Sequence, residues 1–254
     1  MINVVILGAG NVATHLFKAF DSSNDISVIQ VYNRSQKKLA YFEHKTKTTT
    51  SISKILDADL YLIAVADDSI NKLSKKLQFH KKMVAHTSGS VAMNQISKHN
   101  FPCVFYPLQT FTAGKKIDFK NIPLCIEASR DEDLLVLETL AKSISDHVYF
   151  INSSQRKALH IAAVFVNNFV NHLYQKGEDI CKQNNMSFDI LKPLILETAN
   201  KIIDLSPEKS QTGPAKRNDQ KVIEQHLLDL TDTNQQEIYT LLTKSIQKTY
   251  GNKL

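Results

Sequence analysis

A helical segment that begins after Asn152 carries polar side chains in an apolar setting. At about 100° per residue, Lys157, His160, Asn168 and Asn171 fall along one edge, and mostly apolar residues fill the rest of the circumference. An imidazole titrates near neutral pH and can act as a general acid, and an ammonium group can polarise a carbonyl. We therefore expect His160, and after it Lys157, to supply a proton, with Asn168 positioning a substrate. The alternative is a narrow solvated edge, although such edges usually carry Lys and Glu.

A glycine turn near the start of the chain is the second feature. Gly8-Ala9-Gly10-Asn11-Val12-Ala13 separates an apolar run at 2–7 from a helix-like segment, and a second apolar run follows at 26–31. A Gly-x-Gly-x-x-Ala turn between a strand and a helix is the dinucleotide-binding fingerprint. Gly8 permits the tight turn, Gly10 lets the backbone approach a pyrophosphate, and the helix N-terminus receives the anion. The alternative is a similar fold whose turn no longer binds a nucleotide.

The end of the second apolar run indicates which dinucleotide is bound. Proteins that bind NAD usually place an acid there for the ribose 2′-hydroxyl, whereas this chain has Asn33, Arg34 and Ser35. Arg34 offers a planar fork of donors that suits a 2′-phosphate, and Ser35 adds a hydroxyl. A solvated basic helix start is the other interpretation, but basic residues at a helix N-terminus oppose the macrodipole. The sequence therefore predicts NADP as the cofactor.

Three more loops follow predicted strands, and ligands of parallel sheets lie beyond the carboxyl ends of the strands. Ala64-Val65-Ala66 is small enough for a nicotinamide ribose to approach closely. His86-Thr87-Ser88-Gly89 offers an imidazole and two hydroxyls at the expected nicotinamide position, although a structural role for His86 is equally open. Tyr106–Phe111 places Gln109 where it could contact a substrate, or else forms an interdomain packing turn. We expect His86, Ser88 and Gln109 to help bind the substrate.

These loops require alternating strands and helices to position them. Strands are expected at 2–7, 26–31, 47–50, 60–65, 83–86, 103–106, 123–127 and 147–150, with helices between most of them, including one ending near His44 and one ending near Lys98. Asp67 and Asp68 are expected to cap the helix after the fourth strand. This alternation predicts a doubly wound Rossmann domain with a mostly parallel sheet over 1–151. Beyond it, helical patterns at 154–183, 188–205, 216–230 and 234–250 predict an all-helical domain over 152–254.

Composition restricts the classes of protein further. The 254 residues are 43% hydrophobic with a net charge of +6, and no apolar run approaches the roughly 18 residues of a membrane span. The lysines lie in small scattered groups, whereas nucleic-acid-binding proteins concentrate charge and interleave aromatics. Cys103, Cys125 and Cys181 lack metal-ligand spacing. We expect a cytoplasmic protein with reduced thiols that binds no metal, membrane or nucleic acid.

Five motifs together resemble a bacterial family. They are the glycine turn, His86–Gly89, Tyr106–Phe111, Lys157–Asn168 and Thr212–Arg217. Nearly the whole chain is similar to proteins that join a Rossmann-like NADP-binding domain to a helical domain of unknown function. These proteins are related to pyrroline-5-carboxylate reductase, ketopantoate reductase and the wider 6-phosphogluconate dehydrogenase-like superfamily. The resemblance implies an interdomain cleft, dimerisation through the helical half, and NADP contacts at Gly8, Gly10, Asn11, Val12, Asn33, Arg34 and Ser35.

The chain departs from the related families in two places. The motif after Gly213-Pro214 usually continues Arg-Gly-Asp, but here it reads Arg217-Asn218-Asp219; because Asn tolerates left-handed backbone angles, we expect the turn to survive. Related β-hydroxyacid dehydrogenases use a Lys with an Asn one turn later, whereas Lys157 is followed by His160 and Ile161. Their mechanism therefore cannot be transferred intact.

The expected function is hydride transfer between NADP and a small carbonyl or imine held in the interdomain cleft. The cofactor carries the redox chemistry, and the protein orients the substrate and handles one proton. Arg217 is expected to anchor a substrate carboxylate. A homodimer is expected because the helices after residue 151 carry more apolar surface than one small bundle buries. The competing hypothesis is a regulatory or scaffold protein that binds NADP without turnover.

Overall fold

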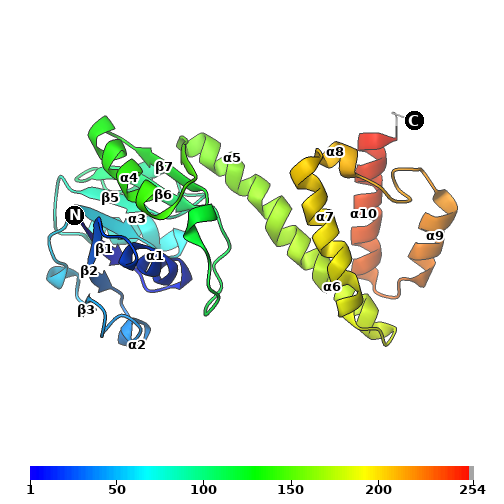
Figure 1. Cartoon of the computed structure of the whole chain (residues 1–254), viewed down its shortest axis with the longest axis horizontal. Helices are drawn as coiled ribbons and strands as arrows, with labels where there is room; N and C mark the ends of the chain where they lie inside the picture. Colours follow the sequence, from blue (N-terminus) through cyan, green and yellow to red (C-terminus); the bar gives the residue numbers. More distant parts are fainter. Residues whose placement is uncertain (252–254) are drawn as a thin grey trace. The chain divides into compact units, whose positions relative to one another are not determined.

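The structure, a computed structural model, describes residues 1–251 and divides into two compact units between Val164 and Phe165 (Figure 1). The first unit holds a sheet with eight strands: β1 (Ile2–Leu7), β2 (Ile26–Tyr32), β3 (Lys47–Thr49), β4 (Leu60–Ile63), β5 (Met83–His86), β6 (Phe101–Pro107), β7 (Leu124–Ala128) and β8 (Val148–Phe150). Its α-helices are α1 (Asn11–Asp21), α2 (Gln36–Leu39), α3 (Asp67–Lys76), α4 (Asp131–Ile144) and α5 (Ser153–Ala163).

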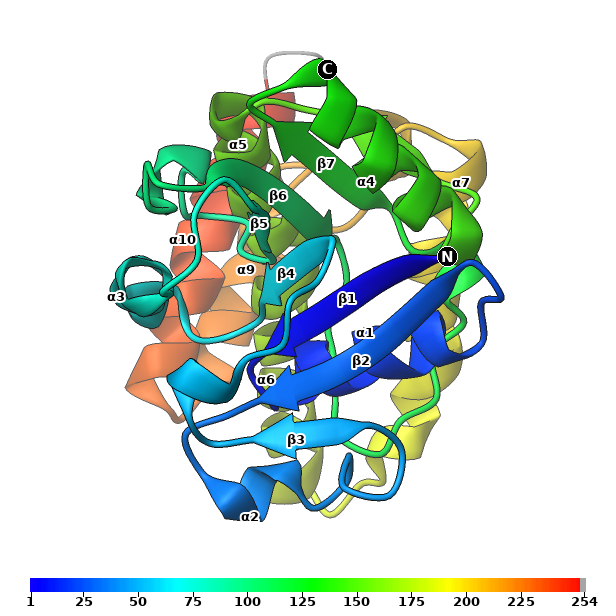
Figure 2. The same cartoon turned by 90° about the vertical axis from the view of Figure 1, so that its left-hand side faces the viewer.

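The strand order predicts a ligand-binding position beyond the carboxyl ends of the central strands. The order is β3-β2-β1-β4-β5-β6-β7-β8, and neighbouring strands are parallel except for the antiparallel pair β6 and β7. Figure 2 shows the strands from β3 to β7 in this order. The chain runs outward from β1 in one direction and, from β4 onward, in the other. Ligands of such sheets bind beyond the carboxyl ends of the strands at this reversal. The expected doubly wound α/β fold with a mostly parallel sheet is confirmed.

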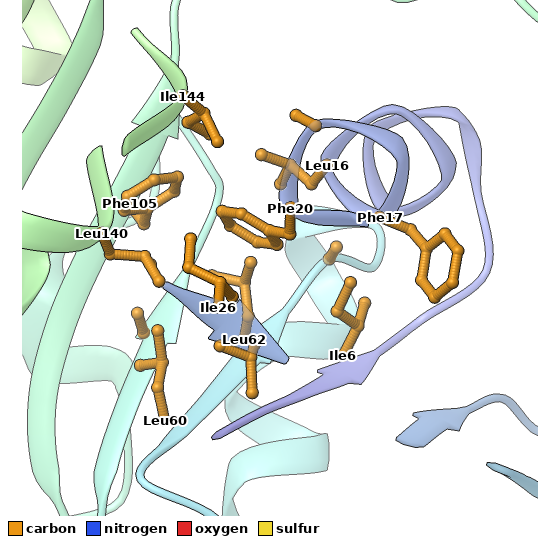
Figure 3. Close-up of a cluster of buried hydrophobic side chains, with 14 of the residues drawn as sticks. Ile6, Leu16, Phe17, Phe20, Ile26, Leu60, Leu62, Phe105, Leu140 and Ile144 are labelled. Atoms are coloured by element: carbon orange, nitrogen blue, oxygen red, sulfur yellow. The ribbon is translucent and has the colours of Figure 1, made fainter. Parts of the chain in front are cut away.

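Apolar side chains on both faces of the sheet hold the helices against it. On one face, Phe20 of α1 and Leu140 of α4 pack against Leu62 and Phe105 of the strands (Figure 3). On the other face, Ile70 of α3 packs in a second buried cluster with Tyr61 and its neighbours. Central parallel strands are buried on both faces, and the fully buried residues of β4 agree with this. The strand ends and the loops after them are thereby held in place.

Local sequence explains where several helices begin. Asn152 accepts a hydrogen bond from the backbone N–H of Gln155, whose side chain in turn accepts one from the Asn152 N–H, so a reciprocal capping box starts α5. Asp67 and Asp68 lie in the first turn of α3, where negative charge complements the macrodipole. Ala66 occupies the cap position itself, so the prediction that these acids cap the helix was wrong.

The second unit is helical. After α5 the chain continues without a break through the π-helix η4 (Val164–Phe169) into α6 (Val170–Gln183). The remaining elements are the 3₁₀-helix η5 (Phe188–Leu191), α7 (Lys192–Asp204), α8 (Pro207–Ser210), α9 (Gln220–Asp229) and α10 (Thr233–Tyr250). Asn218 has a φ of 56°, which confirms that the turn beside Gly213-Pro214 uses the left-handed backbone that Asn tolerates. No helix within residues 1–251 has both the length and the apolar character needed to cross a membrane.

Four sequence expectations about helices differ from the structure. The helix expected to end near Lys98 is only a 3₁₀ turn, η2 (Met93–Gln95), and α2 ends at Leu39 rather than near His44. The helix expected from Lys216 starts at Gln220, because the left-handed Asn218 precedes it and Asp219 caps it. The angular calculation for the polar edge assumed regular α-helix throughout. The wider turns of η4 change the angle per residue, so Asn168 and Asn171 do not continue the edge of Lys157 and His160 as calculated.

Candidate functional site

The turn between β1 and α1 brings two parts of the backbone very close together. Gly8 has a φ of +134°, and a Cβ placed on it would lie 2.1 Å from the Ala64 carbonyl oxygen. The Gly8 N–H donates to the Tyr32 carbonyl at 2.8 Å, which connects the turn to the end of β2. A Cβ on Gly10, by contrast, would meet no atom within 4 Å. Gly8 therefore allows the close approach of the turn to Ala64, whereas Gly10 faces open space that a ligand could occupy.

A cavity of about 660 Å³ lies beyond the carboxyl ends of the strands. Most of the residues expected to bind a cofactor line it: Gly8, Gly10, Asn11, Val12, Asn33, Arg34, Ala64, Val65 and Ala66. Ser35 is absent from this lining, and its side chain makes no capping hydrogen bond to α2. Of the expected substrate residues, Gln109 contributes to the lining and Ser88 does not. The cavity thus gathers the glycine turn, the end of β2 and, with Thr87, all three of the further strand-end loops that the sequence singles out.

Basic residues gather along one part of this cavity. Arg34 and Lys38 line it from the segment after β2, and Lys72 and Lys76 line it from α3. Neither Arg34 nor Lys38 forms an ion pair with any residue that the structure describes. The sequence reasoning missed the contribution of α3, although Ser69, Lys72, Leu73 and Lys76 have the spacing of one helical face. An anionic group is the ligand that such a lining favours.

The loop after β6 closes another part of the cavity. Asn11 Nδ2 donates to the Phe111 carbonyl at 3.0 Å, and His15 Nε2 lies 3.0 Å from the Thr112 carbonyl, so both side chains of α1 hold this loop. Because a carbonyl oxygen can only accept, the His15 ring carries a proton on Nε2. Phe111 and Gln109 line the cavity as a result. The sequence offered no signal for these two contacts, since they join residues about one hundred positions apart.

His86 and Ser88 shape the loop after β5 instead of lining the cavity. His86 is fully buried, and its Nδ1 accepts a hydrogen bond from the Ser88 N–H at 3.2 Å. Burial, assisted by the positive charge of Arg156, lowers the pKa of His86 to about 4, so the ring is neutral near pH 7. Ser88 Oγ accepts from the backbone N–H groups of Ser90 and Val91. Thr87, between the two, reaches the cavity.

Arg156 is a buried charge that connects α5 to the sheet. Its Nη2 lies 3.3 Å from Glu127 Oε2 and donates to the Val91 carbonyl at 2.8 Å. Glu127 also accepts from the N–H and the hydroxyl of Ser153, the first residue of α5. These contacts explain why α5 belongs to the first unit, although the sequence placed the domain boundary at residue 151. Neither Arg156 nor Glu127 was identified from the sequence, because residue type does not show whether a charged side chain is buried.

His160 lies beside the loop after β5. Its Nδ1 is 3.1 Å from the Tyr106 hydroxyl at the end of β6, and a Cβ on Gly89 would lie only 2.6 Å from the same nitrogen. His160 is half-buried, whereas Lys157 is exposed and forms no ion pair with a described residue. The expected catalytic pair is thus split: His160 touches the strand-end loops and Lys157 does not. The sequence marks Tyr106 only as the start of the loop Tyr106–Phe111 and does not predict its contact with His160.

Two expected site residues belong to the second unit. Asn168 is exposed on the π-helix η4, and Arg217 is exposed in the turn that precedes α9. The Arg217 backbone N–H donates to the Gly213 carbonyl at 3.3 Å, and its side chain forms no ion pair with a described residue. Both side chains are therefore available to a ligand or to another chain.

Family comparisons agree with the geometry of the first unit. The family described as "NADP oxidoreductase coenzyme F420-dependent" matches residues 3–88, and a domain of unknown function, DUF2520, matches residues 122–246. No curated protein is similar enough to match this chain.

Solved structures extend this similarity over the whole chain. A "putative NADP oxidoreductase" of Bacteroides fragilis is 38% identical with a TM-score of 0.88, covering 97% of this chain and 98% of that one. Protein TM1727 of Thermotoga maritima is 19% identical, with a TM-score of 0.76 and coverage of 98% and 99%. The 1-pyrroline-5-carboxylate reductase of Streptococcus pyogenes is 12% identical, with a TM-score of 0.65 and 98% coverage of both chains. The last two similarities concern the fold alone.

The first of these relatives and the two matched domains point to the same group of proteins, and they support an NADP-type cofactor. By its extensive similarity to the Bacteroides protein, the chain belongs to the family in which an NADP-oxidoreductase domain is followed by a DUF2520 domain.

Proposed function

We propose that this protein is an NADP-dependent oxidoreductase that transfers a hydride between the nicotinamide ring and a small carbonyl or imine compound. The observation that carries the proposal is the cavity at the carboxyl edge of the sheet, lined by the glycine turn and by Arg34. Thr87 lines the same cavity, and two residues later Gly89 touches His160. A nucleotide site and a candidate proton donor thus share one loop.

The residues of the cavity fit an NADP molecule. Gly10 leaves room at the N-terminus of α1, where backbone N–H groups and the helix dipole favour a pyrophosphate. Arg34 and Lys38 provide positive charge for the 2′-phosphate, and Ala64 to Ala66 leave space for a ribose. When bound, the nicotinamide supplies or accepts the hydride. The chain's own task is to orient the substrate and to move one proton.

His160 is the residue proposed to move that proton. An imidazole changes charge near neutral pH, and a positioned general acid contributes about 10²–10⁴ to a rate. As the hydride adds to the carbonyl carbon, His160 would release a proton to the oxygen, or to the nitrogen of an imine. Asn168 and Arg217 remain proposed substrate residues, with residues 1–151 binding the nucleotide and residues 152–254 contributing to substrate binding and dimerisation. His86 is proposed to act indirectly, by shaping the loop that contains Thr87.

Cofactor selectivity tests the nucleotide site. NADPH is expected to bind more tightly than NADH, and Arg34→Ala is expected to reduce the difference by about 1–3 kcal/mol, the range of a charge-assisted hydrogen bond. Calorimetric titration of both nucleotides measures this. Lys37→Ala is a matched control, because Lys37 lies on α2, three residues after Arg34, but outside the cavity lining, and should leave the difference unchanged. Equal affinities of the wild type for NADPH and NADH would contradict the cofactor proposal.

The second unit is proposed to form a homodimer. Its apolar side chains are widely exposed: Ile203 is 79%, Leu228 78%, Val166 73% and Phe165 63% exposed. Among residues 165–251, the buried hydrophobic side chains are Cys181, Ala215 and Ile223. Exposed apolar patches of this kind mark interaction surfaces. A second copy of the chain is the partner that we propose.

A cytoplasmic location is also proposed. The three cysteines are buried and unpaired, which accords with a reducing compartment.

Light scattering tests the dimer. The wild type is expected to have the mass of a dimer at micromolar concentration, and Phe165→Asp is expected to increase the monomer fraction because it places a charge in the apolar surface. Leu135→Asp is the matched control: Leu135 is 65% exposed on α4 of the first unit. A monomeric wild type, or equal dissociation by both substitutions, would contradict the proposed interface.

The alternative function is NADP binding without turnover, in a regulatory or scaffold role. The exposure of Lys157 and the absence of an Asn one turn later favour it, since the related dehydrogenases pair these two residues. A panel of small aldehydes, ketones and cyclic imines, assayed by NADPH oxidation, distinguishes the two functions. Saturable NADPH binding with no oxidation by any compound would favour the alternative.

A further inference from the structure

Three elements of the first unit meet at the Tyr106 hydroxyl. Tyr106 comes from β6, His160 from α5 and Gly89 from the loop after β5; the Tyr106 hydroxyl is 3.1 Å from His160 Nδ1, and the two rings are tilted by 71°. A Cβ on Gly89 would lie 2.8 Å from the Tyr106 hydroxyl and 2.6 Å from His160 Nδ1. Any side chain at position 89 would therefore force the pair apart. The absence of a side chain at Gly89 is a requirement of this contact.

Tyr106 is suited to hold an imidazole in either charge state. Its side chain is buried, and burial raises the pKa of the hydroxyl to about 12, so it keeps its proton near pH 7. His160 Nδ1 is the hydroxyl's hydrogen-bond partner within the part of the chain that the structure describes. A hydroxyl can donate to a neutral imidazole and can accept from an imidazolium, whereas a carboxylate or a carbonyl can only accept. The contact can therefore persist in both charge states of His160.

The other ring nitrogen of His160 is left for a ligand. His160 Nε2 makes no hydrogen bond with a described residue and is not among the buried polar atoms that lack a partner. When Tyr106 donates to Nδ1, the proton of the neutral ring must be on Nε2. The ring thus presents Nε2 as the atom through which a proton would pass.

We propose that Tyr106 is a positioning residue, whose hydroxyl holds His160 through Nδ1 so that Nε2 faces the substrate, with Gly89 providing the necessary space. The inference rests on the proposed oxidoreductase function. In the reductive direction, the imidazolium donates from Nδ1 to the Tyr106 hydroxyl and would lose its Nε2 proton to the substrate oxygen or nitrogen, while a bound cofactor would supply the hydride to carbon. The ring left behind is neutral, with its remaining proton on Nδ1 and still donated to Tyr106. Nε2 then takes up the next proton from solvent, and Tyr106 neither gains nor loses a proton overall.

Tyr106→Phe tests the contact directly, since it removes the hydroxyl and keeps the ring. The ¹⁵N shifts of His160 are measured at alkaline pH, with Tyr41→Phe as a control because Tyr41 is exposed on the surface of the first unit. The wild type and Tyr41→Phe are expected to show one tautomer with the proton on Nε2, and Tyr106→Phe a mixture. An unchanged tautomer in Tyr106→Phe would overturn the proposal. This readout needs no substrate, so it remains decisive if the proposed reaction fails.

Kinetics then separate positioning from a merely structural role. Tyr106→Phe is expected to lower kcat about three- to tenfold, the worth of one neutral hydrogen bond, without changing NADPH affinity. In a His160→Ala background the same substitution is expected to have no further effect, because the residue it positions is gone. If Tyr106→Phe lowered kcat by the same factor in the His160→Ala background as in the wild type, the proposal would be overturned.

Gly89→Ala provides an independent second variant. Its Cβ would separate Tyr106 from His160, so a mixture of tautomers and at least the kcat loss of Tyr106→Phe are expected. Gly177→Ala is the matched control, because a Cβ there would meet only ordinary contacts, at 3.8 and 3.9 Å. A Gly89→Ala protein that folds and retains the wild-type tautomer would contradict the proposed geometry.

Discussion

His160→Ala is expected to lower turnover by about 10²–10⁴, the contribution of a positioned general acid, while leaving NADPH affinity nearly unchanged. Turnover and NADPH affinity are expected to respond differently because His160 lies outside the lining of the nucleotide cavity. It nevertheless touches Gly89, which is two residues from the cavity residue Thr87. The loss should appear in kcat and kcat/KM together, since the proton is transferred only in the transition state. Steady-state kinetics with a substrate found by NADPH oxidation, together with calorimetric titration of NADPH, measure both quantities.

Two further variants make this test specific. His44→Ala removes an exposed imidazole from the same unit and is expected to leave turnover unchanged. Lys157→Ala tests the second proton donor suggested by the sequence, and its exposed position predicts a much smaller loss than His160→Ala. Full activity of His160→Ala would remove His160 from the mechanism. A loss seen only in Lys157→Ala would transfer the role of acid to Lys157.

Glu127→Ala is expected to destabilise the protein by about 3–5 kcal/mol, the usual cost of removing one partner from a buried ion pair. The Arg156 side chain is 1% exposed and that of Glu127 is 13% exposed. Without Glu127, the guanidinium would stay buried with no counter-charge, and the N–H and hydroxyl of Ser153 would lose their acceptor. Urea denaturation followed by circular dichroism gives the free energy of unfolding.

Glu138→Ala is the matched control for this substitution. Glu138 forms an ion pair with Lys142 on the surface of α4, and such pairs contribute only about 0.3–0.5 kcal/mol. The first unit of the Glu127→Ala protein should also release α5, so amide exchange near Ser153 is expected to increase. Equal destabilisation by both substitutions would show that burial of the Arg156 charge does not dominate the stability of this region.

Local sequence determined the nucleotide-binding half of this protein to a large extent. The order of strands and helices followed from apolar runs separated by turn residues, because a parallel strand buried on both faces needs a continuous apolar segment. The glycine turn and Arg34 stand at a strand end, and the parallel fold brings strand ends to one edge. Most of the cavity lining could therefore be predicted without coordinates. Lys72 and Lys76 were missed, although their helical spacing was available in the sequence.

Helix geometry could not be read from the residues after Ala163. The angular calculation assumed one uniform turn, but η4 is a π-helix, and no residue type in Val164–Phe169 specifies that hydrogen-bonding pattern. The sequence predicts an excess of apolar surface in the second unit, but it does not determine which of these side chains are exposed. Residue type alone does not show whether an apolar side chain is buried within one chain or against another.

The roles of the individual polar residues were decided only by the tertiary structure. His86 and His160 are chemically identical in the sequence, but His86 is buried and neutral, whereas His160 is held by Tyr106 with one nitrogen free. Glu127 and Arg156 are likewise ordinary charged residues until the fold buries them together. Residue type and spacing determine which secondary structure forms and which strand ends meet. A protonation state or a buried charge depends on contacts between residues distant in the chain, and only the packed structure supplies these.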